Sequence, residues 1–128
     1  MAISVVRLGA LRAKDEGLRI GTVRRPPRGV RKTDYGTLDY YDVWLPQLAP
    51  SAELVKVARK RPGAAGWKAF ERQYRRELSG PDTQRLVAVL AALSRTTNFS
   101  VGCYCEDETR CHRSILRAVL AEHGAVIR

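Results

Sequence analysis

VGCYCEDETRCHRSIL, the sequence of residues 101–116, is the stretch around which the rest of the chain is organised. These residues include all three cysteines of the chain, one of its two histidines, three acids and two arginines. Such a mixture makes poor core material, because burying charge costs free energy and thiols are reactive. We therefore interpret this stretch as the functional site.

The flanks of the stretch have different periodicities. Residues 98–104 alternate like a short strand, whereas residues 114–120 repeat apolar side chains at helical spacing. This pattern predicts a strand, an acidic turn and then a helix. Cys103 and Cys105 should share one face of the strand, because side chains two residues apart point the same way.

The predicted helix begins at Cys111, with Asp107 or Thr109 as its capping residue. The N–H groups and dipole of a helix N-terminus favour an anion or a thiolate. The first turn of this helix should therefore carry three reactive residues, namely Cys111, His112 and Arg113.

A family resemblance begins at these residues. Cys105-Glu106, the acidic spacer and the run from Cys111 to Leu116 resemble the C-terminal signature of domain-of-unknown-function family 488, the YeaO-like proteins. PRGV at 27–30 and WLPQLAPSAEL at 44–54 resemble two further blocks of that family. With the aromatic helix at 67–78, the resemblance covers nearly the whole chain, and it implies family membership while saying almost nothing about function.

The chain departs from the family pattern near residue 22. The family's usual Val-Asp-Arg aligns with Thr22-Val23-Arg24, so an expected aspartate is missing, and the family's tryptophan falls on Pro26. Arg24 and Arg28 remain at matching positions. A mechanism that depended on that aspartate would therefore not carry over to this chain.

Composition predicts one domain, because 128 residues with 45% apolar content suffice for a single core. The N-terminus lacks a secretory signal pattern and no apolar run is long enough for a membrane helix, so we expect a cytoplasmic protein with no membrane partner. The net charge of +10 favours polyanionic partners, although a basic surface can also be a solvated shell.

The rest of the chain predicts an α/β (or α+β) fold in which helices pack on a small sheet and the C-terminal strand-loop-helix carries the cysteines. The expected strands are 3–8, 18–24, 38–45 and a last short one at 124–127, and the expected helices are 52–59, 67–78 and 81–94. Ser51 is the N-cap candidate of the first helix. In a parallel sheet, the loop after Cys105 would lie at the strand ends where sites gather.

Helical spacing also predicts which side chains are buried. In the second helix an aromatic stripe favours the core over a base-stacking platform, and in the third the apolar positions predict another buried face. The two predicted faces are Trp67, Phe70, Tyr74 and Leu78, and Leu86, Val89, Leu90 and Leu93.

An anion pocket is predicted beside the loop at residues 25–32, which prolines stiffen. Arg24 and Arg28 would converge there on the helix that starts at Cys111, because the guanidinium fork binds carboxylate or phosphate oxygens in pairs. The alternative is a solvated basic loop.

Three kinds of chemistry fit the stretch at 101–116. In the first, Cys111 or Cys105 is a nucleophile, with His112 or Glu106 as proton carrier. The alternative to a reactive role is a structural one, in which Cys103 packs as a small hydrophobic residue and Cys111 packs at the N-terminus of the helix. A second possibility is that the groups bind an anion without covalent chemistry. A phosphatase loop is disfavoured, because Arg110 follows Cys105 by only five positions.

The third kind of chemistry is zinc binding. Three cysteines and a histidine supply the right number and type of ligands: Cys103, Cys105, Cys111 and His112. The spacing disfavours this reading, because adjacent Cys111 and His112 would have to reach one ion from a single helical turn. We therefore assign no metal ligand from the sequence.

The sequence thus predicts a protein that recognises an anionic, phosphate- or carboxylate-bearing small molecule, with the reaction, and whether there is one, left open. The predicted catalytic residues are Cys105, Glu106, Cys111 and His112, and the predicted substrate-binding residues are Arg24, Arg28 and Arg113. The alternative is a nucleic-acid-binding module that uses the basic face at residues 7–32 and the arginines of the second helix. A homo-oligomer is also compatible with the sequence.

Overall fold

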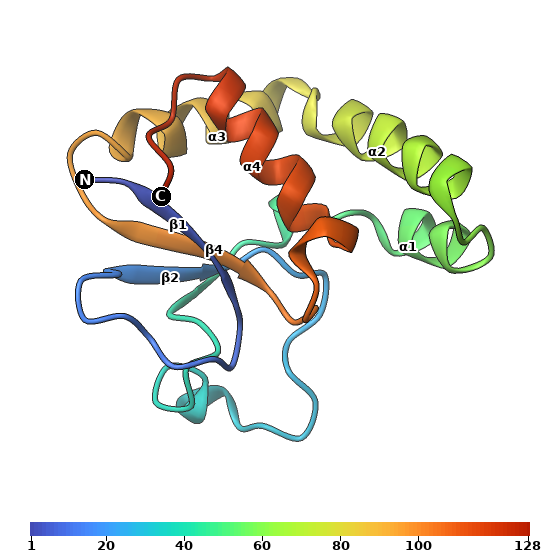
Figure 1. The fold of residues 1–128 in the computed structure, drawn as a ribbon. Coiled ribbons are helices and arrows are strands. Elements are labelled where there is room, and N and C mark those ends of the chain that lie inside the picture. The colour runs from blue at the N-terminus through green and yellow to red at the C-terminus, as the bar shows by residue number, and fades with distance from the viewer.

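Four parallel strands form the sheet at the centre of the molecule (Figure 1). The computed structural model describes all of residues 1–128. Across the sheet the order is β1 (Ile3–Arg7), β4 (Phe99–Cys103), β2 (Leu18–Gly21) and β3 (Val43–Trp44). The strand that leads into the cysteine-rich stretch therefore lies inside the sheet, and all five of its residues are buried.

Four helices complete the α/β fold that the sequence predicts: α1 (Ala52–Arg59), α2 (Ala64–Leu78), α3 (Pro81–Leu93) and α4 (His112–Glu122). In Figure 1 these helices lie on one side of the strands, and the loops at 8–17 and 22–42 lie on the other. After α4 the chain returns to the sheet, where Ile127 forms a parallel bridge with Ile3. None of the helices has the length and apolar character required to cross a membrane.

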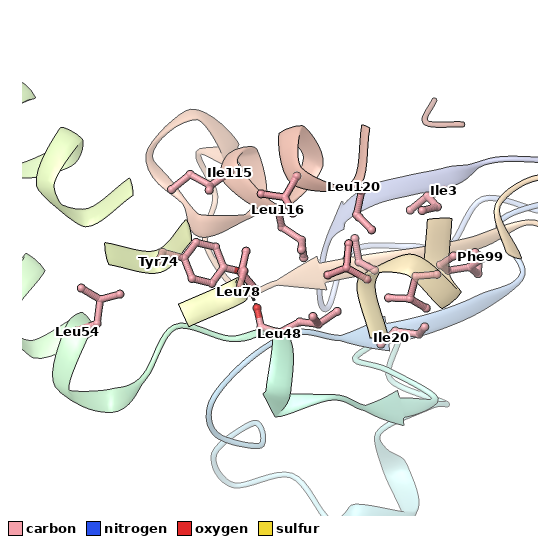
Figure 2. Close-up of a cluster of buried hydrophobic side chains, with 14 of the residues drawn as sticks. Ile3, Ile20, Leu48, Leu54, Tyr74, Leu78, Phe99, Ile115, Leu116 and Leu120 are labelled. Carbon is pink, nitrogen blue, oxygen red and sulfur yellow. Dashed lines mark hydrogen bonds between the residues drawn. The ribbon is translucent and has the colours of Figure 1, made fainter. Parts of the chain in front are cut away.

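The main core lies between the helices and the sheet (Figure 2). Ile20 and Val101 point into it from neighbouring strands, and Leu116 enters from α4. The aromatic stripe of α2 packs as predicted: Phe70, Tyr74 and Leu78 are buried, and Trp67 is half-buried. The hydroxyl of Tyr74 donates to the carbonyl of Leu48, as Figure 2 shows, which satisfies the one polar atom that this ring brings into the core.

A buried ion pair lies on the loop side of the sheet. Arg19 stands opposite Ser100 in the strand register, and its guanidinium donates to both carboxylate oxygens of Glu16, at 2.7 and 2.9 Å. The remaining nitrogen donates to the carbonyls of Ala10 and Asp39, while Ser100 donates to Glu16 at 2.6 Å. This network fixes the β1–β2 loop.

Two predicted features are wrong in detail. The strand expected at 38–45 is reduced to Val43–Trp44, because the chain turns at Asp39, whose φ is 62°. Arg12 stabilises this turn by binding the carboxylates of Asp39 and Asp42. β2 is likewise shorter than expected and ends at Gly21.

The predicted buried face of α3 is correct only in part, because Leu90 is buried and Leu86 packs against the core, but the other two predicted residues are exposed. Val89 and Leu93 are 54% and 43% exposed, respectively. Val87 and Ala91, which the helical spacing did not select, are buried in their place. Apolar residues occur all round this helix, so periodicity alone did not decide which face packs against α4.

Candidate functional site

The junction between β4 and α4 places the cysteine-rich stretch at the C-terminal edge of the sheet. Asp107 caps a short 3-10 turn at Glu108–Arg110, where its carboxylate accepts from the N–H of Thr109 at 3.0 Å. Cys111 is itself the N-cap of α4 and has an extended backbone, with φ −119° and ψ 150°. The prediction that Asp107 or Thr109 caps this helix is therefore wrong, and Cys111 lies just outside its first turn.

His112 is held in one tautomer by the chain after β2. Its Nε2 lies 2.7 Å from the carbonyl oxygen of Thr22, and a carbonyl can only accept, so Nε2 carries the proton. In the neutral ring Nδ1 then has a free lone pair, which faces Cys111 Sγ at 3.7 Å. Tyr74 contacts the ring edge-on, with centroids 5.6 Å apart. The imidazole is thus oriented from both sides.

The three thiols gather beside this imidazole, and none forms a disulfide. Cys103 and Cys105 do share one side of the chain, as predicted, with their sulfurs 3.8 Å apart. One ligand atom from each of Cys103, Cys111 and His112 lies within 4.8 Å of the others, and all three residues are buried. Cys105 is exposed at the edge of this group. These residues are the ones that could hold a metal ion.

Ionisation is unequal among the thiols. Interaction with the thiols of Cys103 and Cys105 lowers the pKa of Cys111 despite its burial. The same contacts, together with burial, raise the pKa of Cys103. A single thiolate centred on Cys111 is therefore the favoured charge state of the reduced cluster.

Arg113 provides a buried positive charge next to the cluster. Its side chain is only 3% exposed and forms no ion pair with a carboxylate. One guanidinium nitrogen donates to the carbonyl of Cys105 at 2.6 Å, whereas Nε has no partner. Because a buried cation requires a nearby negative charge, this residue supports a thiolate in the cluster and fixes the turn at Cys105.

A cleft of about 1480 Å³ opens above the cluster. We call it the basic cleft, and we call three of its buried residues, Cys103, Cys111 and His112, the cleft floor. Four aromatic residues line it, namely Tyr40, Trp67, Phe70 and Tyr104. No carboxylate lines it, and its seven cationic residues are Arg24, Arg25, Arg28, Lys56, Arg59, Arg61 and Arg110.

The structure brings most of the predicted site residues together. Arg24 and Arg28 line the same cleft as Cys105, Cys111 and His112. Arg24 also donates to the carbonyls of Ala49 and Pro50, so it ties the loop after β2 to the start of α1.

Two predicted residues lie elsewhere. Glu106 does not line the cleft, because its side chain is 84% exposed and pairs with Arg7 at 3.5 Å. Arg113 is beneath the surface and does not line the cleft either.

Sequence reasoning missed the part of the cleft wall that α1 and the turn after it provide. Lys56, Arg59 and Arg61 reach the cleft from α1 and the turn after it, far from the cysteines in the sequence. A signal was present, because Lys56 to Arg61 holds four basic residues in six positions directly before Pro62. The contact between Thr22 and His112 had no side-chain signal, because the acceptor is a backbone carbonyl.

Fold and site together define an α/β protein with a cysteine-rich centre at the C-terminal ends of parallel strands. The family model described as the Active DUF488-N3 subclade matches residues 3–124, so the chain belongs to this family. The match confirms the resemblance seen in the sequence. No curated protein and no solved structure matches the chain.

Proposed function

We propose that the protein is an enzyme that binds a phosphate-bearing substrate in the basic cleft and transforms it at the cleft floor. One observation carries this proposal: seven cationic side chains line a cleft that contains no carboxylate, and its floor is a buried Cys-His cluster. None of these seven side chains forms an ion pair within the protein. Their charges are thus available to a ligand.

Phosphate is favoured over carboxylate as the recognised group. Six of the seven cations are arginines, whose planar guanidinium binds phosphate oxygens in pairs. They come from three segments, around residues 24–28, 56–61 and 110, and so can surround a group that carries several negative oxygens. A ligand with a single carboxylate would neutralise only a small part of this positive charge.

The cleft floor supplies the reactive groups. Cys111 is the thiol whose ionisation is favoured, and the Nδ1 lone pair of His112 lies beside it. Together they can hold and pass a proton next to a bound substrate. The family description calls the subclade active, which supports a reaction in addition to binding.

A thermal-shift screen against phosphorylated metabolites, nucleotides and short oligonucleotides tests the proposal, with Cys111→Ser measured beside the wild type. A ligand at one hundred times its Kd stabilises the folded state by about 2.7 kcal/mol. We expect a phosphorylated compound to stabilise the wild type and to be consumed only by the wild type. If no phosphorylated compound stabilised the wild type, the proposal would be wrong.

A second candidate function is the binding of single-stranded nucleic acid. The cleft volume of about 1480 Å³ exceeds the 300–1,000 Å³ that is usual for small-molecule sites. Trp67 is half-buried, lines this cleft and stacks on Phe70, so its ring lies beside the cations. A strand in the cleft could place its phosphates on the arginines and a base on the aromatic wall.

Fluorescence anisotropy of a labelled single-stranded oligonucleotide at increasing salt distinguishes the two candidates. Each phosphate contact to single-stranded nucleic acid contributes about −0.7 to the slope of log K against log salt. The nucleic-acid module would be favoured by three results together. The salt slope would correspond to four or more phosphate contacts, Cys111→Ser would leave the binding constant for the oligonucleotide unchanged, and no phosphorylated compound would be turned over. Absence of oligonucleotide binding at low salt would exclude it.

A further inference from the structure

We propose that the cleft floor is a zinc site in which Cys103, Cys111 and His112 are the protein ligands. The fourth coordination position faces the basic cleft beside Cys105. This inference goes beyond substrate recognition and does not depend on which ligand the cleft binds. In the zinc-bound protein, the Cys111 thiolate and the Nδ1 lone pair of His112 are bound to the ion, which then replaces this pair as the reactive centre of the cleft floor. It assigns a metal to the residues that lie between the cationic wall and the core.

The interatomic distances are close to the edges of a tetrahedral site. With Zn–S bonds of about 2.3 Å and a Zn–N bond of about 2.0 Å, neighbouring ligand atoms are about 3.5 to 3.8 Å apart. Cys111 Sγ and His112 Nδ1 are 3.7 Å apart, and Cys103 Sγ completes a set whose members all lie within 4.8 Å. An ion therefore requires only a small contraction of this set.

The backbone at residue 111 explains how adjacent residues can share one ion. Two residues in the first turn of a helix point about 100° apart, which is the geometry that makes the sequence pattern unfavourable for zinc. Cys111 is instead extended, whereas His112 is helical. The change of conformation between them turns both side chains toward Cys103.

The surroundings of His112 are those of a metal ligand. Histidines that bind metals usually donate their second ring N–H to a carbonyl or carboxylate, which fixes the tautomer. His112 donates Nε2–H to the carbonyl of Thr22 at 2.7 Å, so Nδ1 is available to the ion. The edge-on contact with Tyr74 holds the ring plane.

Charge balance also fits the site. Two thiolates and a neutral imidazole neutralise Zn²⁺, and zinc removes the mutual repulsion that opposes a second thiolate in the free cluster. The exposed Cys105 lies 3.8 Å from Cys103, sulfur to sulfur, at the cleft side. An ion with an open position here would polarise a phosphoryl oxygen or a water molecule delivered by the cleft.

Zinc reconstitution tests the site without any substrate. Reduced, metal-free protein is incubated with zinc, desalted and analysed for metal, and the same protein is titrated with Co²⁺. We expect about one zinc ion per chain, and cobalt absorption bands characteristic of tetrahedral thiolate coordination. Less than about a tenth of an equivalent of zinc with no thiolate-to-cobalt band would overturn the proposal.

Two ligand variants and two controls localise the ion. His112→Gln keeps an N–H donor for the Thr22 carbonyl but removes the Nδ1 ligand, and Cys111→Ser removes a thiolate. Both should lower zinc affinity by 10-fold or more, in the range of about 10- to 100-fold that even outer-shell changes produce. His123→Gln changes the other histidine and should keep the ion. Full zinc affinity in both ligand variants would contradict the assignment.

The last control concerns the fourth position. Cys105→Ser should keep about one zinc ion per chain, because three buried ligands remain. Loss of zinc in this variant would show that Cys105 is a fourth ligand of a closed site, and it would contradict the proposal that the fourth coordination position is open. If a variant fails to fold, thiol labelling of the wild type with and without zinc takes its place. Zinc should slow the labelling of Cys103 and Cys111 more than that of Cys105.

Discussion

Among single residues, Glu16 and Arg19 stand out because they form the most buried ion pair of the molecule. Their ion pair is 2% and 1% exposed, and every oxygen of the carboxylate accepts at least one hydrogen bond. Breaking a buried pair leaves an uncompensated charge, which costs more than the intact pair contributes. The pair joins the β1–β2 loop to the central strand β4 through Ser100.

Glu16→Gln should lower the free energy of unfolding by about 3 to 5 kcal/mol, because it leaves the Arg19 charge buried and unpaired. Urea unfolding followed by circular dichroism measures this change. Asp15→Asn is the matched control, since Asp15 pairs with Arg128 at the surface. Equal unfolding midpoints for the two variants would contradict the structural role of the buried pair.

The same carboxylate should make stability pH-dependent. Burial alone would raise the pKa of Glu16, but hydrogen bonds from Arg19 and Ser100 outweigh it and lower the pKa. In the folded chain, the carboxylate of Glu16 therefore stays ionised below about pH 4.3, the pH at which a glutamate in the unfolded chain takes up a proton. The contribution to stability is complete above that pH and is lost as pH falls through the folded-state pKa.

Acid titration of the unfolding free energy tests this linkage. Wild type should lose stability more steeply below about pH 4.3 than Glu16→Gln, which has no carboxylate to protonate at this position. Parallel pH profiles for the two proteins would show that Glu16 does not contribute. The comparison removes the background from the other carboxylates, which both proteins share.

Among the secondary-structure elements, α1 links fold and site, because it carries Lys56 and Arg59 into the cleft wall. Its eight residues need a good cap, since short helices are marginal alone. Ser51 supplies it: Oγ accepts from the N–H of Leu54 at 3.1 Å and donates to Glu77 at 2.6 Å. The cap therefore also ties α1 to the end of α2.

Ser51→Ala should reduce stability by about 1 kcal/mol, within the usual range for the loss of an N-cap. It should also weaken ligand binding in the cleft, because Lys56 and Arg59 lose their fixed position. Ser79→Ala serves as control, since its hydroxyl donates only within the C-terminus of α2. A ligand affinity unchanged in Ser51→Ala would argue against a rigid α1 wall.

Two glycines with positive φ allow the loss of stability from backbone strain to be measured separately from the loss caused by steric overlap. Gly17 has φ 80°, and a Cβ there would lie 2.0 Å from the carbonyl oxygen of Asn98, the residue before β4. Gly29 has φ 71° and open space around it. Both Gly→Ala variants should lose about 1 kcal/mol from backbone strain. Gly17→Ala should lose substantially more, and equal thermal midpoints would contradict the close loop-to-strand packing.

Secondary-structure elements could be predicted from the sequence where the local conformational preferences of their residues agree with the tertiary packing. β1, α1 with its Ser51 cap, and the buried side of α2 follow from alternation, capping and helical spacing. The 38–45 segment has strand-forming residues, but ion pairs from Arg12 hold it in a turn. Such long-range pairs leave no local pattern in the sequence.

At the scale of the whole molecule, the net charge of +10 is distributed unevenly. Many arginines outside the basic cleft are paired with acids, as Arg12, Arg75 and Arg117 are. The cations of the cleft have no such partners. The overall composition could suggest a polyanionic ligand, but only the fold could show that the unpaired cations collect above the cysteines.

The site was therefore predictable in part. The cysteine-rich stretch and the two arginines at positions 24 and 28 have sequence signals, and they do meet at one cleft. The exposed position of Glu106 and the burial of Arg113 depend on the turn between β4 and α4, which no pattern specified. The extended backbone of Cys111, which brings its sulfur to His112, also had no signal in the sequence.

Calorimetric titration with inorganic tripolyphosphate tests the central claim most directly, because it compares cations inside and outside the cleft at equal net charge. Arg28→Ala/Arg59→Ala removes two cleft cations, and Arg72→Ala/Arg76→Ala removes two exposed cations of α2 that do not line it. We predict wild-type affinity in the α2 variant and a loss of about tenfold or more in the cleft variant. Equal losses in the two variants would show that net charge, not the basic cleft, recognises the anion.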